Sequence, residues 1–277
     1  MADGCNHDCD HCSSNCSENN AIKKLIPNGD TNIKKIIGVS SGKGGVGKSF
    51  VTSLIAASLQ KKGYKCGIID ADILGPSIPR SFGIKNEHLE VENNLMKPKI
   101  SKTGIKIISS NFLLSEENEP IIYRGMLISS VMQQFYTDVD FGDLDFLFID
   151  MPPGTGDVAL TTYQMLPIDG VIIVSTPQSL VNMIVEKSIN MAEKMNIEII
   201  GLIENMSYVE CPNCKTQIKI FGESDIEKIA KKHNVEILSK IPIRENNLKM
   251  IDEGHVEDID IPEINSAIDK LVQIAKG

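Results

Sequence analysis

The chain has no excess of basic residues, no long apolar run and no tryptophan. Its 277 residues carry 28 Lys and Arg against 37 Asp and Glu, which gives a net charge of −9. An acidic chain is a poor non-specific binder of nucleic acid or of anionic membranes. No stretch approaches the roughly 18 consecutive apolar residues of a transmembrane helix. We therefore expect neither a nucleic-acid partner nor a membrane partner, whereas the lack of tryptophan excludes no class of protein.

The N-terminus also lacks the basic and apolar regions of a secretory signal peptide, because it is polar and acidic. Hydrophobic residues make up 42% of the chain, which is enough for a full core. The length suits one large α/β domain or two small ones. We expect a cytoplasmic protein with a folded domain over residues 31–277. Residues 1–30 contain too few hydrophobic residues to pack, and they predict a disordered tail.

Residues 42–49 read G-K-G-G-V-G-K-S and satisfy the phosphate-loop pattern G-x-x-x-x-G-K-[ST] at every fixed position. An apolar, β-branched stretch at residues 35–40 leads into this run. Such a loop turns its backbone N–H groups toward an anion at a helix N-terminus. Lys48 then reaches the β- and γ-phosphates, and Ser49 coordinates Mg²⁺. The predicted nucleotide-binding residues of the loop are Gly42, Lys43, Gly44, Gly45, Val46, Gly47, Lys48 and Ser49.

Lys43 is a second lysine in the loop, which an ordinary phosphate loop does not need. A lysine at this place projects away from its own nucleotide, so its natural use is to reach a phosphate held by a second subunit. The run resembles the deviant Walker A ATPases, which include MinD, ParA and the nitrogenase iron protein. The resemblance implies that the nucleotide is ATP and that ATP lies between the subunits of a homodimer. It also implies that Lys43 is catalytic in trans, as an arginine finger is elsewhere.

Short apolar runs alternate with helix-period stretches along the rest of the chain. Strands are predicted at residues 35–40, 65–70, 105–108, 145–150, 171–174, 199–203 and 235–238. Helices are predicted at residues 50–59, 125–136, 158–165, 180–195, 224–233 and 261–276. This alternation predicts an α/β fold with a mainly parallel sheet flanked by helices on both faces. Ligands bind such sheets at the carboxyl ends of the strands.

Acidic residues follow two of these strands. Asp70 and Asp72 are spaced i, i+2 on an extended segment and face the same way, which suits a Mg²⁺ shell and an attacking water. A simple hydrogen-bonded turn is the alternative. Asp150 precedes the proline- and glycine-rich run 151–157, the arrangement of a Walker B acid that holds Mg²⁺ through water and of a switch II loop. The resemblance implies that Asp72 lies in switch I and orients or deprotonates the water.

Asn205 follows the predicted strand at residues 199–203, at the end of the run Leu202-Ile203-Glu204-Asn205. An asparagine at a strand end is usually turn chemistry. The resemblance implies a second use, because this position matches the one whose side-chain amide reads the adenine edge in the deviant Walker A ATPases.

Six of the seven cysteines fall into two groups, and Cys66 stands alone on a predicted buried strand, where it is expected in the core. Cys211 and Cys214 form a Cys-Pro-Asn-Cys turn with two thiolates facing one point. A redox dithiol normally opens a helix in a thioredoxin-like fold, so a metal or cluster site is the better interpretation. A zinc ion or a [4Fe–4S] cluster takes four ligands, so two thiolates leave either one two ligands short. A two-fold axis supplies a second pair, and four cysteines then bind one bridging [4Fe–4S] cluster or one Zn²⁺.

Several motifs occur along the chain in a fixed order. They are the phosphate loop with Lys43, the run 70–77, Tyr123-Arg124-Gly125-Met126, the run 150–157, Glu204-Asn205-Met206-Ser207, and the pair Cys211 and Cys214. Together they resemble the Mrp/Nbp family of iron–sulfur cluster carrier ATPases, from about residue 33 to the C-terminus. The resemblance implies a homodimer that holds a labile [4Fe–4S] cluster between Cys-Pro-x-Cys insertions, here near residues 206–222. It also implies transfer of the cluster to apo iron–sulfur proteins. The Arg-Gly segment commonly follows Trp in this family, and here it follows Tyr123.

The tail carries the other cysteine group, with the spacing C-x3-C-x2-C-x3-C. Its members are Cys5, Cys9, Cys12 and Cys16. Four closely spaced cysteines can bind one tetrahedral metal or one cluster unaided. Some relatives carry an N-terminal four-cysteine cluster site with wider spacing, so zinc stays open as the alternative to a cluster. Disulfides are disfavoured in the cytosol.

The sequence therefore predicts an ATP hydrolase that serves as an ATP-dependent iron–sulfur cluster carrier. The alternative is a zinc-stapled positioning or regulatory ATPase of the MinD/ParA type. Such a protein should end in a basic amphipathic helix or show a basic DNA-binding face, and the final segment 269–277 is short and weakly charged. An ATP-driven electron donor would take its cluster cysteines from two separate segments.

Overall fold

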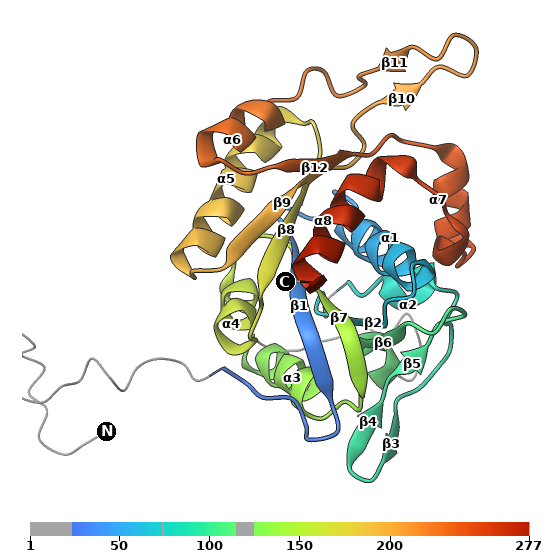
Figure 1. Cartoon of the computed structure of the whole chain (residues 1–277), viewed down its shortest axis with the longest axis vertical. Helices are drawn as coiled ribbons and strands as arrows, with labels where there is room; N and C mark the ends of the chain where they lie inside the picture. The colour runs from blue at the N-terminus through green and yellow to red at the C-terminus, as the bar shows by residue number, and fades with distance from the viewer. Residues whose placement is uncertain (1–23, 74, 115–124, 277) are drawn as a thin grey trace, which may run out of the picture.

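The computed structural model describes residues 24–73, 75–114 and 125–276. This part of the chain contains an eight-stranded sheet with the order β12-β9-β8-β1-β7-β2-β6-β5 (Figure 1). Neighbouring strands are parallel except at the edge, where β5 pairs antiparallel with β6. The strands are β1 (Asn32–Ser41), β2 (Cys66–Asp70), β5 (Lys99–Ile100), β6 (Lys106–Ser109), β7 (Asp143–Asp150), β8 (Gly170–Ser175), β9 (Glu198–Glu204) and β12 (Ile237–Lys240). The mainly parallel sheet predicted from the sequence is confirmed.

Helices cover both faces of this sheet, as the alternating pattern predicts. Figure 1 shows α3, α4, α5 and α6 on one side and α1, α2, α7 and α8 on the other. Their bounds are α1 (Lys48–Lys61), α2 (Ile78–Ser81), α3 (Gly125–Thr137), α4 (Asp157–Met165), α5 (Ser179–Lys194), α6 (Ile226–His233), α7 (Glu245–Asp252) and α8 (Asn265–Lys276). The first helix follows β1 directly, so the phosphate loop lies at the carboxyl end of a central strand.

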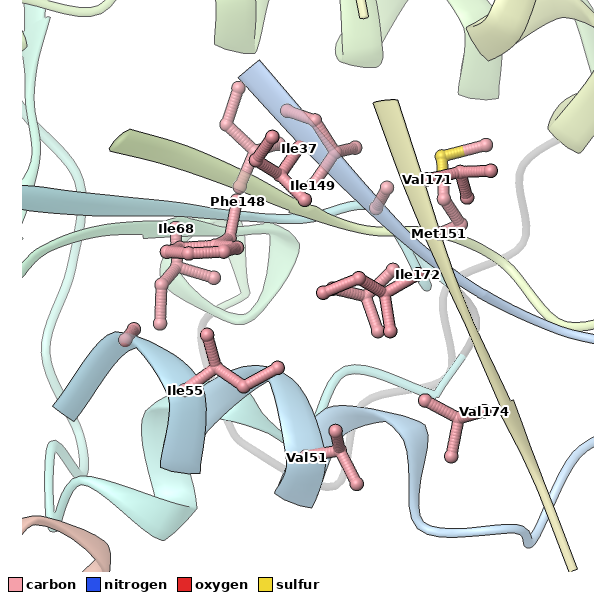
Figure 2. Packing of buried hydrophobic residues seen from close by; sticks show 14 of the residues in the cluster. Ile37, Val51, Ile55, Ile68, Phe148, Ile149, Met151, Val171, Ile172 and Val174 are labelled. Carbon is pink, nitrogen blue, oxygen red and sulfur yellow. The ribbon is translucent and has the colours of Figure 1, made fainter. Parts of the chain in front are cut away.

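The core consists of apolar side chains on both faces of the central strands. In Figure 2, Phe148 of β7 and Ile172 of β8 lie on the side of the sheet that faces Val51 and Ile55 of α1. All four of these side chains are completely buried. Strands that are covered on both faces consist of nearly continuous apolar residues, which explains why the runs in the sequence identify them. This packing fixes the strand ends that carry the polar residues of the site.

Some elements differ from the sequence prediction. The strand expected at 235–238 lies two residues later, at Ile237–Lys240, and the helix expected at 261–276 begins with a 3-10 turn at Pro262–Ile264 before α8 starts at Asn265. The hairpin of β3 (Glu90–Glu92) and β4 (Leu95–Lys97) has no counterpart in the prediction. Its residues are mostly exposed and lack apolar periodicity, so no pattern marks them. The helices α2 and α7 are short, and they too were not predicted.

Two predicted features lie outside the described residues. These are the tail cysteines Cys5, Cys9, Cys12 and Cys16, and the pair Tyr123 and Arg124. Of the helices within residues 24–73, 75–114 and 125–276, none combines the length and the hydropathy that crossing a bilayer requires.

Candidate functional site

Polar residues meet at the carboxyl ends of three adjacent strands. In the strand register, Asp150 of β7 pairs with Val39 of β1 on one side and with Asp70 of β2 on the other. The phosphate loop leaves β1 after Ser41 and enters α1 at Lys48. Gly45 and Gly47 in this loop have φ values of 80° and 79°, a region that favours glycine. The motif residues are therefore brought together at one edge of the sheet, as predicted.

Asp150 is the centre of the nucleotide site. Its Oδ2 lies 2.7 Å from Nζ of Lys48 and accepts a hydrogen bond from Oγ of Ser49 at 2.6 Å, and its Oδ1 accepts one from Thr52 at 2.8 Å. Lys48 and Asp150 are both buried. The ion pair holds Nζ of Lys48 at the start of α1, beside the phosphate loop. Thr52 was not predicted, although its position four residues after Lys48 places it on the same side of α1.

The same residues fit the groups that the motif implies. Nζ of Lys48 is buried and, despite its ion pair, forms no hydrogen bond of good geometry with the described residues. Such an orphaned donor suits a phosphate oxygen. The adjacent hydroxyl of Ser49 and carboxylate of Asp150 are hard oxygen ligands of the kind that Mg²⁺ prefers.

A cleft of about 330 Å³ opens over this loop. Its walls are the phosphate loop together with Asp72, Ser77, Pro153 and Ile251. Pro153 belongs to the predicted switch II run, and Asp72 to the predicted switch I segment. The cleft is thus bounded by the loop that would hold phosphate and by the two segments expected to respond to it.

Asp70 and Asp72 both lie close enough to Lys48 and Asp150 to feel their charges, but the two side chains differ in burial. The strand β2 ends at Asp70, so the alternation of a strand no longer applies at Asp72. Asp70 is fully buried, and its Oδ2 accepts hydrogen bonds from the backbone N–H groups of Ser77 and Ile78. Burial, followed by the charge of Asp150, raises the pKa of Asp70 to about 8. Asp72 is half-buried in the cleft wall, where burial raises its pKa.

Lys43 contacts its own chain in this structure. Its Nζ donates a hydrogen bond of 2.5 Å to Oε1 of Gln178, the residue that precedes α5. No sequence pattern indicates a role for Gln178, because the contact joins residues 135 positions apart. Lys43 also lines the cleft, so it stands beside the nucleotide site.

Asn205 lies against the phosphate loop. Its Nδ2 donates a hydrogen bond of 2.9 Å to the backbone oxygen of Val46, and the side chain is buried. A Cβ atom at Gly47 would lie 2.2 Å from this Nδ2. The close approach explains why glycine is needed at position 47 in addition to the backbone angle.

Cys211 and Cys214 occupy the turn of a hairpin that projects from the body near the end of β9 (Figure 1). The hairpin strands are β10 (Val209–Glu210) and β11 (Gln217–Ile218). The N–H of Cys211 donates to the backbone oxygen of Thr216, and Lys215 N–H donates back to that of Cys211. These bonds close the turn and keep both thiols at its tip.

The environment of Cys214 favours a thiolate. Cys214 is exposed, whereas Cys211 is half-buried. Hydrogen bonding with the side chain and then the backbone of Thr216, followed by that with the side chain of Cys211, lowers the pKa of Cys214 to about 7. Among the residues that the structure describes, no group of three or more His, Cys, Asp or Glu side chains could hold a metal ion. Within this part of the chain, the two thiols thus have no third ligand beside them.

Comparisons with known proteins agree with this geometry. A profile of the ParA family described as NUBPL iron-transfer P-loop NTPase matches residues 32–276. The iron-sulfur cluster carrier protein of Clostridium perfringens is 44% identical over 234 residues, covering 82% of each chain. The protein of the same name from Methanocaldococcus jannaschii is 45% identical over 249 residues, covering 86% of this chain and 85% of its own.

Two solved structures place the fold. A nucleotide-binding protein from Archaeoglobus fulgidus, solved in complex with ADP, superposes with a TM-score of 0.75 at 43% identity and covers 84% of this chain and 91% of its own. The MinD cell division protein of Aquifex aeolicus, in its complex with MinC, gives a TM-score of 0.62 at 20% identity, over 88% of this chain and 96% of that chain. The second likeness concerns the fold alone.

Proposed function

Because this chain belongs to the ParA family of NUBPL-type iron-transfer P-loop NTPases, we propose that it is an ATP-dependent carrier of iron–sulfur clusters. The observation that carries the proposal is the presence in one chain of a nucleotide site built around Asp150 and of two thiols on a projecting hairpin. The first part can bind and hydrolyse ATP, and the second can hold a cluster as cargo. Several relatives bear the name iron-sulfur cluster carrier protein.

ATP hydrolysis follows from the residues of the cleft. Lys48 neutralises phosphate charge, while Ser49 and Asp150 hold Mg²⁺, which supplies charge neutralisation to the transferred phosphoryl group. Asp72 orients the attacking water and contributes to the Mg²⁺ shell. Lys43 leaves Gln178 and reaches the phosphates held by the partner in the dimer. Asn205, which already touches the loop, reads the adenine edge.

The cluster is held between two copies of the chain. Each copy offers Cys211 and Cys214, and a [4Fe–4S] cluster takes four thiolates. A two-fold axis through the hairpin tips brings the two pairs together. The lowered pKa of Cys214 supports this use, because the thiolate is the form that binds metal. The receivers are apo iron–sulfur proteins, and the use of free thiols is compatible with a reducing compartment such as the cytosol.

The tail is a second cluster site in this proposal, with Cys5, Cys9, Cys12 and Cys16 as ligands. Zinc competes with a cluster there, because four closely spaced thiolates also satisfy tetrahedral zinc. The tail is therefore separated from the hairpin in the experiment that tests the function.

Anaerobic reconstitution with iron and sulfide is that experiment. We would record visible absorbance and count iron, acid-labile sulfide and zinc in the wild type and in the Cys211→Ala/Cys214→Ala variant. Asn213→Ala, which changes the same turn but no thiol, is the matched control. A third protein, with the four tail cysteines replaced by serine, isolates the bridging site.

The proposal expects a charge-transfer band in the tail variant and in Asn213→Ala. It expects the bridging cluster to be absent from the double cysteine variant. A colourless tail variant that retains one zinc per dimer would instead support the zinc-stapled ATPase.

A further inference from the structure

The turn after β9 touches both the nucleotide site and the cysteine hairpin. Asn205 donates to Val46 of the phosphate loop, and the preceding residue, Glu204, accepts hydrogen bonds from the segment that carries the cysteines. Asn205 is the first residue after β9, and Glu204 is the last residue of that strand. One turn therefore contacts the phosphate loop with one side chain and the hairpin segment with the next.

Glu204 holds the base of the hairpin. Its carboxylate is only 1% exposed. Ser207, which precedes β10, donates to Oε1 at 2.5 Å, and Ser224, which lies beyond β11, donates to Oε2. Because the two serines lie on either side of residues 209–218, a single carboxylate joins the chain entering the hairpin to the chain leaving it. A buried carboxylate that loses such donors is strongly destabilised, so these two bonds define the local geometry.

The tip of the hairpin stands away from the body in the described part of the chain. Residues 212–220 are exposed. The ion pairs Lys215–Glu210 and Lys219–Glu223 lie within the segment and do not join it to the body. A cleft of about 420 Å³ separates the hairpin from α6 and β12, and Glu204 borders it. Just above the base, a β-bridge from Val209 to Ile243 and a hydrogen bond between Tyr208 and Glu263 connect the start of the hairpin to the body.

The backbone of the turn is held by β8 and by the chain after β12, while the Asn205 side chain contacts the phosphate loop. Met206 has a φ of 57°, a backbone conformation that residues other than glycine rarely adopt. Its backbone is fixed because the N–H of Asn205 donates to Ser175 and that of Ser207 donates to Ile241. A strained turn of this kind persists only when its surroundings determine it. A change in the phosphate loop that moves Asn205 must therefore also shift Glu204.

We propose that Glu204 is a positioning residue that transmits the nucleotide state of the phosphate loop to Cys211 and Cys214 through Ser207 and Ser224. The inference rests on the proposed function, which identifies the hairpin as the site that holds the cluster. Nucleotide binding at the loop changes the orientation of the hairpin relative to Glu204, and it thereby changes the accessibility and reactivity of the two thiols. By linkage, a ligand on the thiols changes nucleotide affinity by the same factor.

The test measures thiol reactivity in the full chain without iron, so its outcome does not depend on whether a cluster forms. Iodoacetamide labelling of Cys211 and Cys214 is followed by peptide mass spectrometry with no nucleotide, with ADP and with a non-hydrolysable ATP analogue. We expect the nucleotide to change the wild-type labelling rate by about fivefold, the lower end of ordinary coupling between sites. Ser207→Ala/Ser224→Ala should abolish that difference while the affinity for the analogue stays unchanged.

Glu223→Gln is the matched control, because this residue borders the same cleft and forms an ion pair with Lys219 on the hairpin segment. It should retain the full nucleotide effect. Ser224→Ala alone serves if the double variant does not fold, and it should reduce the effect. A wild type with no nucleotide effect, or serine variants that keep it, would overturn the inference. Failure of cluster reconstitution would overturn only the proposed function.

Discussion

Asp70 and Asp150 lie opposite each other at the ends of the parallel strands β2 and β7, and neither side chain is exposed. Only Asp150 lies in an ion pair with Lys48, whereas Oδ1 of Asp70 has no hydrogen-bond partner among the described residues. Burial and the neighbouring charge raise the pKa of Asp70 to about 8 from 3.8. Near neutral pH the folded chain therefore holds a proton that the unfolded chain does not.

This proton makes stability depend on pH at Asp70. Between the two pKa values the folded state binds more protons than the unfolded state, so the free energy of unfolding falls as pH rises. Asp70→Asn removes this contribution but keeps an oxygen for the N–H groups of Ser77 and Ile78. We expect the variant to gain stability relative to the wild type steadily from about pH 5 to about pH 8.

Urea unfolding without nucleotide or Mg²⁺ measures this difference. Asp145→Asn is the control of opposite sign, because a hydrogen bond from Lys34 lowers the pKa of Asp145. Its contribution is present above its unfolded pKa and lost only in acid, so this variant should show no slope between the same pH values. A flat difference for Asp70→Asn would show that Asp70 is ionised in the folded chain.

The sequence predicts which residues of the candidate nucleotide site lie together where the motif itself determines the geometry. The loop at residues 42–49 and Asp150 lie together as expected, because the strands that carry them are buried, continuous apolar runs. The sheet is identified for the same reason. Periodicity and spacing are sufficient signals when packing on both faces leaves one arrangement.

The prediction fails where the chain leaves regular structure. Asp72 follows the end of β2, and it is half-buried where Asp70 is fully buried, a difference that the spacing of the two residues does not predict. The contact between Lys43 and Gln178 joins distant loops, and no local pattern encodes it. Glu204 reads as the last residue of an apolar strand, and its role depends on Ser224, twenty positions away. Tertiary packing alone brings these residues together.

Lys43 provides a test of whether two copies share one site. Lys43→Ala and Asp72→Asn should each abolish hydrolysis, the first because the trans charge is lost and the second because the water is not oriented. When the two variants are mixed, half of the dimers are hybrids, and each hybrid has one complete site if Lys43 acts in trans. The mixture should therefore recover about a quarter of wild-type phosphate release.

A mixture that stays inactive would indicate that Lys43 acts on its own nucleotide. Binding of a fluorescent ATP analogue to each single variant is the control. It should be retained in both, because Lys48 and the loop backbone are intact.

Thr216 controls the ionisation of Cys214. Thr216→Val removes the hydroxyl whose hydrogen bond contributes most to lowering the pKa of Cys214 to about 7. We expect the pH midpoint of Cys214 alkylation to rise and the labelling rate at neutral pH to fall several-fold, because the thiolate is the nucleophile. Thr216→Ser keeps the hydroxyl and should leave the midpoint in place. If the valine variant kept the wild-type midpoint, the backbone N–H and Cys211 would be the groups that stabilise the thiolate.

Gly45 and Gly47 separate backbone strain from steric contact within one loop. Both have φ near 80°, so alanine costs about 1–2 kcal/mol at either position. A Cβ atom at Gly45 meets nothing within 4 Å, whereas at Gly47 it would lie 2.2 Å from Nδ2 of Asn205. Gly47→Ala must therefore also displace Asn205 from Val46, and we expect it to lower the free energy of unfolding by about 1–3 kcal/mol more than Gly45→Ala.

Asn205→Gly removes the obstructing side chain and completes this comparison. In the Gly47→Ala background, Asn205→Gly should recover most of the free energy of unfolding that Gly47→Ala loses beyond Gly45→Ala. After correction for the effect of Asn205→Gly alone, the double variant should therefore be about as stable as Gly45→Ala. Denaturant unfolding of the four proteins without nucleotide forms a double-mutant cycle for the contact. Equal losses for the two alanine variants, or additive effects of Gly47→Ala and Asn205→Gly, would mean that Asn205 yields freely and does not hold the loop. The proposed coupling between the phosphate loop and Glu204 would then lack a physical link, because Asn205 is the residue of this turn that donates a hydrogen bond to the loop.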